Sequence, residues 1–267
     1  MLSLSVTAAT KHKKTTRVNT DSDSVWLYNV TDNVIEYDRN SQAVRPMASI
    51  TKLMTAMVTL DHDRDLDRKL LLSRRVGGHL PHGSYTRREL LMAMLVKSDN
   101  AAAETLAEGH LLGREGFIAD MNRHAQEWGM TNMQFSDPSG LSAANVATAR
   151  EIGEMITLSA SYWLIREIST MKQIAIDTHY KNRVRTINLN NTNTPILFEF
   201  DNIMVSKTGL TSRAGFCLAL FVQQNGRQYA AVFLGEPTIQ QRTDKVKRVL
   251  YNHVVDANLS KSVAAHN

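Results

Sequence analysis

This chain of 267 residues has a single cysteine, Cys217, so it forms no internal disulfide and its cysteine usage leaves the redox compartment undecided. It contains neither His-Glu-x-x-His nor Gly-x-Ser-x-Gly, which removes the common signatures of metalloproteases and α/β-hydrolases. His79 and His82 share one loop, but no third ligand follows at a recognisable spacing. We therefore predict loop histidines, no metal and no cofactor. No apolar run is long enough to predict a transmembrane span.

A strong charge of one sign is also missing. The formal net charge is +5, from 31 basic and 26 acidic residues, which is a weak bias. A nucleic-acid reader would be expected to cluster lysine and arginine or stacking aromatics on one face, and we find no such cluster, so no nucleic-acid partner is expected. Residues 1–23 are polar and hold four of the basic residues. We predict a flexible, solvated tail there, in preference to a segment that attracts an acidic polymer.

Hydrophobic patterning predicts an α+β fold. Residues 25–30 and 34–37 read as a hairpin, residues 48–169 as mostly helical, and residues 216–222 and 229–234 as strands joined at Asn225-Gly226, a strong hairpin signal. A last helix places four apolar residues on one side: Val246, Val249, Leu250 and Val254. Strands from both chain ends would make one antiparallel sheet, with helices on its faces. Cys217 lies in an apolar strand and is expected in the core.

Ser49 and Lys52 form the first motif that carries chemistry. A serine hydroxyl needs a neighbouring base to become a good nucleophile, and a side chain three residues on in a helix lies on the same face. Pro46 upstream indicates the start of a helix. Its buried face would be formed by the apolar residues Ile50, Leu53, Met54, Met57 and Val58. The N–H of Ser49 would then be unpaired and available to an oxyanion. The alternative is a helix-capping serine followed by a solvated lysine.

The second motif is Ser98-Asp99-Asn100. Residues 86–89 (TRRE) read as a capping box ahead of one helix, and a second helix is expected to begin near Ala101. The triplet then occupies the short turn between them. Asn100 would cap the second helix in the ordinary interpretation. In the active-site interpretation Ser98 shares a network with two lysines and passes on a proton, while Asn100 binds substrate.

The third motif, Lys207-Thr208-Gly209, is predicted to end an apolar strand that begins at Ile203. Lysine would supply a positive charge and threonine a hydroxyl, while glycine would let a peptide approach the strand edge. This suits a substrate with a free carboxylate. Taken alone, the same three residues read as an ordinary turn.

The order and setting of the three motifs carry the evidence, because each is uninformative alone. Ser169 and Lys172 repeat the spacing of Ser49 and Lys52, but they follow the Ser-Asp-Asn triplet, and nothing around them suggests a buried helix start. The ordered set resembles the motifs of penicillin-binding proteins and class A β-lactamases. Residues 45–56, 95–102, 137–141 (DPSGL), 191–193 (NTN) and 207–211 narrow the resemblance to low-molecular-mass D-alanyl-D-alanine carboxypeptidases and endopeptidases, over about residues 25–235.

The resemblance implies a β-lactamase/transpeptidase-like fold and a role for each matching residue. Ser49 would be the acylated nucleophile, Lys52 its general base and Ser98 the proton relay. The residues implied in substrate binding are Asn100, Lys207, Thr208, Gly209 and Leu210, with the N–H groups of Ser49 and Leu210 as the oxyanion hole. Asn191 and Asn193 match an Asn-x-Asn element whose role is less clear, and they stay outside the catalytic set. Peptidoglycan peptides would be the substrates and β-lactam antibiotics covalent inhibitors.

Two alternatives stay open beside a serine D,D-peptidase. A β-lactamase of the same fold would need fast deacylation, and we find no Glu-x-x-Leu-Asn setting for the class A glutamate. A non-catalytic sensor of wall fragments would not need all the catalytic side chains. Fewer than 60 residues follow Gly209, too few for an added β-rich domain. This favours the endopeptidase branch over carboxypeptidases.

The resemblance also implies a periplasmic or other extracytoplasmic location. Export needs a signal, yet residues 1–10 lack a basic start and a full apolar run. Leu2, Leu4 and Val6, followed by Ala8-Ala9, would fit the end of an incomplete signal. We expect one catalytic domain over residues 24–260, with a disordered end at 261–267.

Overall fold

A five-stranded antiparallel sheet is built from both ends of the chain, in the order β2-β1-β11-β10-β9. The computed structural model describes residues 23–180 and 183–255, so most of the predicted tail and the predicted disordered end lie outside the described residues. The strands are β1 (Ser24–Asn29), β2 (Val34–Arg39), β9 (Ile203–Thr211), β10 (Gly215–Gln224) and β11 (Arg227–Glu236). The β10–β11 turn has Asn225 at φ 50° and Gly226 at φ 75°, the geometry that such a turn requires. Both predicted hairpins are confirmed.

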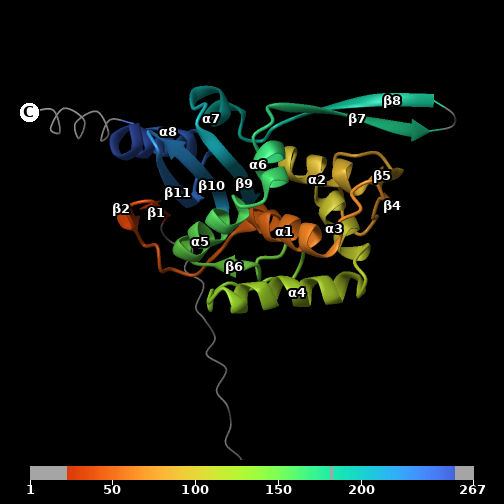
Figure 1. Ribbon diagram of the computed structural model, residues 1–267, viewed down its shortest axis with the longest axis horizontal. Helices are drawn as coiled ribbons and strands as arrows, with labels where there is room; N and C mark the ends of the chain where they lie inside the picture. Colours follow the sequence, from red (N-terminus) through yellow and green to blue (C-terminus); the bar gives the residue numbers. More distant parts are fainter. Residues whose placement is uncertain (1–22, 181–182, 256–267) are drawn as a thin grey trace, which may run out of the picture.

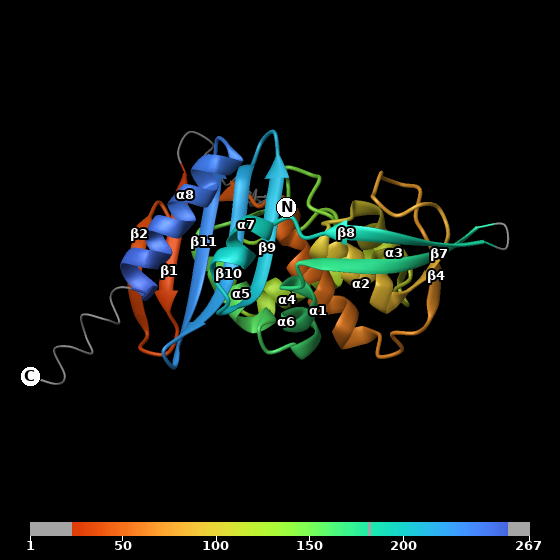
Figure 2. The same cartoon turned by 90° about the horizontal axis from the view of Figure 1, so that it is seen from above.

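Helices cover both faces of this sheet (Figures 1 and 2). On one face lie α7 (Thr194–Glu199) and α8 (Ile239–Leu250), the latter continued by a π-helical turn, Tyr251–Val255. On the other lie the remaining helices: α1 (Lys52–His62), α2 (Arg87–Val96), α3 (Asn100–Glu108), α4 (Gly113–Glu127), α5 (Ala149–Ser159) and α6 (Trp163–Ser169). Each face of the sheet packs into its own hydrophobic core. Side chains of β11 alternate between the two, as the period of two along a strand requires: Val232 and Leu234 lie in the core shared with α1–α6, and Phe233 lies in the core shared with α8.

Three two-stranded pairs complete the fold. They are β3 (Arg45–Pro46) with β6 (Val146–Ala147), β4 (Lys69–Leu71) with β5 (Ser84–Thr86), and β7 (Gln173–Tyr180) with β8 (Arg183–Asn190). The β7–β8 hairpin projects away from the body of the molecule (Figure 1), and its base packs on α2. Our sequence analysis did not predict this hairpin. None of the helices in the described ranges is long and apolar enough to cross a membrane.

The start of α1 differs from the prediction. Pro46 lies in β3, and Ser49 lies in a short 3₁₀ helix, η1 (Ala48–Thr51), that precedes α1. The α-helix begins only at Lys52. Its expected apolar residues are all fully buried, but so is the whole stretch from Lys52 to Val58. Up to Val58, α1 is therefore buried on every side, whereas Asp61 and His62 at its end are exposed.

Candidate active site

The 3₁₀ turn η1 brings Ser49 and Lys52 together. Residues three apart eclipse one another in a 3₁₀ helix, and here the Lys52 Nζ donates a hydrogen bond to the Ser49 Oγ at 2.9 Å. Ala48, just before Ser49, has φ 48°, a left-handed conformation that costs a residue with a side chain about 1–3 kcal/mol. The surrounding contacts therefore hold Ala48 in a backbone conformation that a residue with a side chain disfavours.

The Lys52 ammonium is entirely buried and surrounded by oxygen atoms. Besides Ser49 it donates to the Asn100 Oδ1 at 2.7 Å and to the backbone carbonyl of Ser139. Burial lowers the pKa of Lys52 to about 7, against the opposing influence of Asp137, Asp99 and Glu104. A large fraction of this amine is thus neutral near pH 7, which a base that accepts the Ser49 proton requires.

Ser98 lies in the turn between α2 and α3, as predicted. It too has a left-handed backbone, φ 62°, and its Oγ accepts a hydrogen bond from the Lys207 Nζ at 3.0 Å. The cap of α3 is Asp99, whose carboxylate accepts the Ala102 N–H at 2.8 Å. Asn100 is thus the first helical residue and its side chain reaches Lys52 instead of capping. The triplet does cap the second helix, as in the ordinary interpretation, but the capping residue is Asp99 and not Asn100.

Lys207, Thr208 and Gly209 lie in the middle of β9, the edge strand of the sheet, which continues to Thr211. We had placed them at the end of the strand. Burial, helped by the nearby positive charges of Lys52 and Arg242, holds the pKa of Lys207 well below its usual value. Burial therefore disfavours a positive charge on Lys207.

Packing gives a second reason for glycine at position 209, beside the approach of a peptide that we predicted. A Cβ there would lie 2.9 Å from the Met47 carbonyl oxygen and 3.1 Å from the Ala48 Cβ. Contacts this short are not tolerated without a shift of the backbone. Gly209 therefore lets β9 pack against the turn that carries Ser49.

One cavity of about 290 Å³ brings the three motifs together. Of the predicted residues, those that line it are Ser49, Ser98, Asn100, Thr208, Gly209 and Leu210, while Lys52 and Lys207 are buried behind them. A larger cavity of about 750 Å³ contains Arg39 and Lys245 and none of the three motifs. We assign the candidate site to the smaller cavity because residues of all three predicted motifs meet there.

Sequence analysis missed several residues of this cavity: His79, Lys97, Leu141, Thr192, Phe216, Ile239 and Arg242. Arg242, on α8, is 2% exposed, and its Nε and Nη2 have no hydrogen-bond partner among the described residues. A guanidinium stays protonated in proteins. Arg242 is thus a buried, permanently charged cation of this cavity. Nothing in its sequence context distinguishes it from the other basic residues of α8.

The loop at residues 137–141 supports the turn that carries Ser49. In the sequence it was one of the segments that carry the family resemblance, with no role assigned to it. The Asp137 carboxylate accepts backbone N–H bonds from Ser139 at 2.7 Å and Gly140 at 2.6 Å, which fixes the Ser139 carbonyl beside Lys52. Gly140 has φ 81°, and a Cβ there would lie 2.0 Å from the Ala48 carbonyl oxygen. Glycine is required at this position by both the backbone conformation and the close contact.

The Asn-x-Asn element has a structural and a cavity-facing part. Asn191 donates to the Ser169 and Met171 carbonyl oxygens, and Asn193 donates to the Ser206 Oγ at 2.9 Å. Between them Thr192 lines the cavity, with its Oγ1 2.6 Å from the Thr208 Oγ1. The two asparagines thus hold the segment that presents Thr192, which supports leaving them outside the catalytic set.

Comparison with known proteins identifies relatives of this chain. It is 34% identical over 221 residues to the D-alanyl-D-alanine endopeptidase of Escherichia coli (strain K12), covering 80% of this chain and 71% of the relative. It is 38% identical over 192 residues to the D-alanyl-D-alanine endopeptidase of Pseudomonas aeruginosa, covering 69% and 61%.

A solved structure and a family model agree with these relatives. The structure is penicillin-binding protein D2 from Listeria monocytogenes in its cefotaxime-bound form, with a TM-score of 0.76, 25% identity and coverage of 85% of this chain and 94% of that one. The predicted α+β fold is confirmed. The model of peptidase family S11, D-alanyl-D-alanine carboxypeptidase, matches residues 8–238. The chain belongs to this family of serine peptidases.

Proposed function

We propose that this protein is a serine D,D-peptidase that cleaves D-alanyl amide bonds of peptidoglycan peptides through an acyl-enzyme on Ser49. One observation carries the assignment of residues. Two buried lysines each contact a serine at the same cavity, Lys52 at 2.9 Å from Ser49 and Lys207 at 3.0 Å from Ser98. This pairs a nucleophile with a base and a second hydroxyl with a hydrogen-bond donor.

The chemistry then follows in two steps. Neutral Lys52 takes the proton of Ser49 as the Oγ attacks the D-alanyl carbonyl, and the N–H groups of Ser49 and Leu210 would stabilise the oxyanion. Loss of one such donor typically costs about 3 kcal/mol of transition-state stabilisation. Ser98, in contact with Lys207, delivers a proton to the leaving nitrogen as the C–N bond breaks. The proton that Lys52 took from Ser49 replaces it, so that Lys52 is neutral again and can activate the incoming water. Water then hydrolyses the ester and restores Ser49.

Substrate binding would rest on the edge strand and on Arg242. Asn100 would hold the substrate backbone, while Thr208 would bind a terminal carboxylate with Lys207 and Arg242. Because Arg242 stays charged, it supplies the permanent positive charge, and an arriving carboxylate would favour the protonated form of Lys207. Gly209 contributes by keeping the strand close to Ser49.

We favour cross-linked peptides over pentapeptide monomers as substrates. Two relatives that match well over this chain are named D-alanyl-D-alanine endopeptidases. The cleavage of a D,D-cross-link and the release of free D-alanine share the acyl-Ser49 intermediate and differ in the leaving group. The exposed rim residue His79 and the half-buried Lys97 line the same cavity and would suit a leaving group with a carboxylate.

The test is incubation of the purified protein with defined cross-linked dimers and, separately, with pentapeptide monomers, followed by mass spectrometry. We expect dimers to be cleaved faster than monomers, and Ser49→Ala to cleave neither. Rapid D-alanine release with intact dimers would overturn the endopeptidase preference. Cleavage by Ser49→Ala equal to that of the native protein would overturn the proposed nucleophile.

β-Lactam antibiotics are proposed as covalent inhibitors of the same serine. The structurally similar Listeria protein is described with cefotaxime bound, and the sequence offers no class A glutamate setting for fast deacylation. We therefore expect a long-lived penicillin ester, whereas rapid turnover of penicillin would favour the β-lactamase alternative. Peptidoglycan peptides belong to the cell wall. We therefore propose that the protein acts outside the cytoplasmic membrane.

A further inference from the structure

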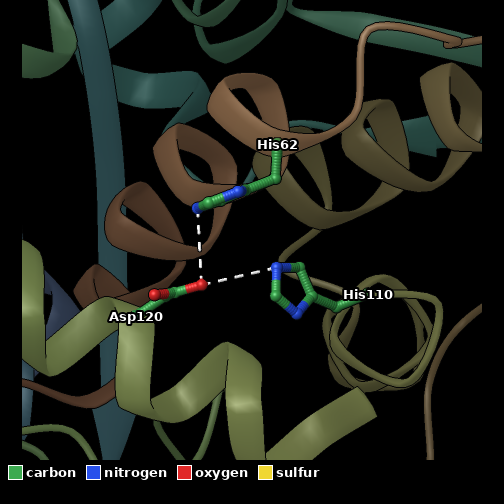
Figure 3. A group of neighbouring side chains, drawn as sticks. All are labelled: His62, His110 and Asp120. Carbon is green, nitrogen blue, oxygen red and sulfur yellow. Dashed lines mark ion pairs between the residues drawn. The ribbon is translucent and has the colours of Figure 1, made fainter. Parts of the chain in front are cut away.

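Two histidines and an aspartate converge at the far end of α1 from Ser49 (Figure 3). We call this group the histidine cluster: His62, the last residue of α1; His110, after α3; and Asp120, on α4. The Asp120 Oδ2 lies 3.4 Å from the Nε2 atoms of both His62 and His110. All three atoms lie within 4.8 Å of one another. The end of α1, the segment after α3 and helix α4 therefore direct one N or O atom each to a common point.

The spacing of these atoms fits a bound cation. Tetrahedral zinc binds histidine nitrogen and carboxylate oxygen at about 2.0–2.1 Å, which separates neighbouring ligand atoms by about 3.3 Å. Two of the three separations in the histidine cluster already have this value. By contrast, 3.4 Å exceeds the range of roughly 2.7–3.2 Å that a good N–H···O bond prefers. The group is better matched to a shared metal than to two direct hydrogen bonds.

Neighbouring side chains orient the carboxylate and one imidazole. Arg123 donates to the Asp120 Oδ1 at 3.1 Å, which leaves the Oδ2 directed at the histidines. The His110 ring packs edge-on against Phe117 and its side chain is 4% exposed. Partners of this kind fix metal ligands in known sites. The His62 side chain is 37% exposed, so an ion can enter from that side and keep water as a fourth ligand.

The local electrostatics also favour a cation. The cluster adjoins the C-terminus of α1, the negative end of its helix dipole. Asp61 and Asp63 flank His62 in the sequence, although each also pairs with a neighbour, His124 and Arg87 respectively. A metal would place its positive charge among these carboxylates.

One contact opposes metal binding and defines the alternative. The Leu112 N–H donates to the His110 Nδ1 at 3.3 Å, which leaves the proton of a neutral imidazole on Nε2. A metal on Nε2 must displace that proton to Nδ1, and this long hydrogen bond is lost. If His110 keeps this hydrogen bond, the three residues form an ion-paired cluster and bind no metal.

We propose that His62, His110 and Asp120 form a zinc site, with water completing the tetrahedron. The site stabilises the fold by joining the C-terminus of α1 to α4 and to the segment after α3. It lies apart from the cavity that holds Ser49 and takes no part in the peptidase chemistry.

The test uses the full chain, zinc ions as the probe, and no activity measurement. Zinc stoichiometry would be measured by titration, and the midpoint of thermal unfolding would be measured with zinc and after chelation by EDTA. We expect one zinc ion per chain at this site and a higher midpoint with zinc. Cobalt substitution should give the visible absorption bands of a tetrahedral N/O site.

Variants separate the site from adventitious binding. His110→Asn and Asp120→Asn should each lose that zinc ion and the EDTA-sensitive part of the midpoint. His62→Asn should do the same and, because its side chain is partly exposed, is the variant least prone to misfold. His82→Asn, an exposed histidine outside the cluster, is the matched control and should keep both. Arg123→Ala should weaken affinity by about 10–100-fold without changing the stoichiometry.

Two results would overturn the proposal. The first is a native protein that binds no stoichiometric zinc and unfolds at the same temperature with zinc and with EDTA. The second is zinc binding that survives unchanged in the folded His62→Asn, His110→Asn and Asp120→Asn variants, since the ion would then be held elsewhere. Neither result bears on Ser49.

Discussion

Two serine-x-x-lysine tetrapeptides occur in this chain, residues 49–52 and 169–172, and their surroundings differ. Lys52 is fully buried and contacts Ser49, whereas Lys172 is exposed and lies 4.2 Å from the centre of the exposed Phe198 ring. Ser169 ends α6 and its Oγ accepts the Ser206 N–H at 3.3 Å. The same spacing thus gives a buried, hydrogen-bonded serine–lysine pair in one place and a packing contact in the other.

The difference shows what the tetrapeptide needs in order to act. A 3₁₀ turn must align the two side chains, and the lysine must be excluded from water so that its pKa falls. Both conditions come from residues outside the tetrapeptide, including Gly140 and Gly209, which allow two backbone segments to pack against the Ala48 turn.

The largest expected effect is the loss of the first serine. Ser49→Ala should reduce acylation by penicillin by a factor on the order of 10⁶, to below detection, because no other nucleophile replaces it. Labelling with a fluorescent penicillin measures this, and Ser169→Ala should label as the native protein does. Labelling that depends on Ser169 would reverse our assignment of the two tetrapeptides.

The first lysine should matter next most. Lys52→Arg should slow acylation by about 10²–10⁴-fold, since a guanidinium stays protonated and cannot act as the base. Stopped-flow acylation kinetics would measure the loss, with Lys172→Arg as the matched control at the other tetrapeptide. Near-native acylation by Lys52→Arg would exclude Lys52 as the base.

The third largest effect is expected at Arg242, a buried cation that lines the same cavity as Ser49. Arg242→Gln should lower kcat/KM for peptides with a free terminal carboxylate by about 10–100-fold, the value of a hydrogen bond to a charged group. Amidated peptides should be much less affected. Arg248→Gln, an exposed arginine on the same helix, is the control. Equal losses for both peptides would remove Arg242 from carboxylate binding.

The pH dependence tests the environment of Lys52 directly. Its pKa is lowered to about 7, so the amine is protonated and inactive as a base at lower pH. Acylation should therefore rise about tenfold per pH unit below pH 7 and level off above it. A pH profile of penicillin acylation measures this rise. A rise in acylation centred near the ordinary lysine pKa would show that burial does not lower the pKa of Lys52.

The smallest effect is expected at the second serine, and on stability alone. Ser169→Ala removes an acceptor from the buried Ser206 N–H and should lower the free energy of unfolding by about 1–3 kcal/mol. Urea denaturation measures the loss. Ser161→Ala, where the exposed hydroxyl only contacts a nearby helix carbonyl, should cost less. A stability loss no larger than that control would show that Ser169 has no packing role.

Local patterns in the sequence predicted much of the fold. The two hairpins follow from turn residues that tolerate left-handed backbone, as at Asn225-Gly226, and the capping box at Thr86 formed as expected. The β7–β8 hairpin was missed. The 3₁₀ start of α1 was missed as well, because tertiary contacts impose the left-handed Ala48 backbone, and local propensity does not predict it.

By itself the sequence determined which residues can do the chemistry, because the three motifs in their order specify a serine, two lysines, a second hydroxyl and an amide. It also determined the family, which the comparisons confirm. Only the tertiary structure showed that the Lys52 amine is fully buried, that Arg242 from α8 lines the same cavity, and that Asp137 holds the Ser139 carbonyl at Lys52. The physical reason is that desolvation and close backbone packing arise between segments that are distant in the chain, and no local spacing encodes them.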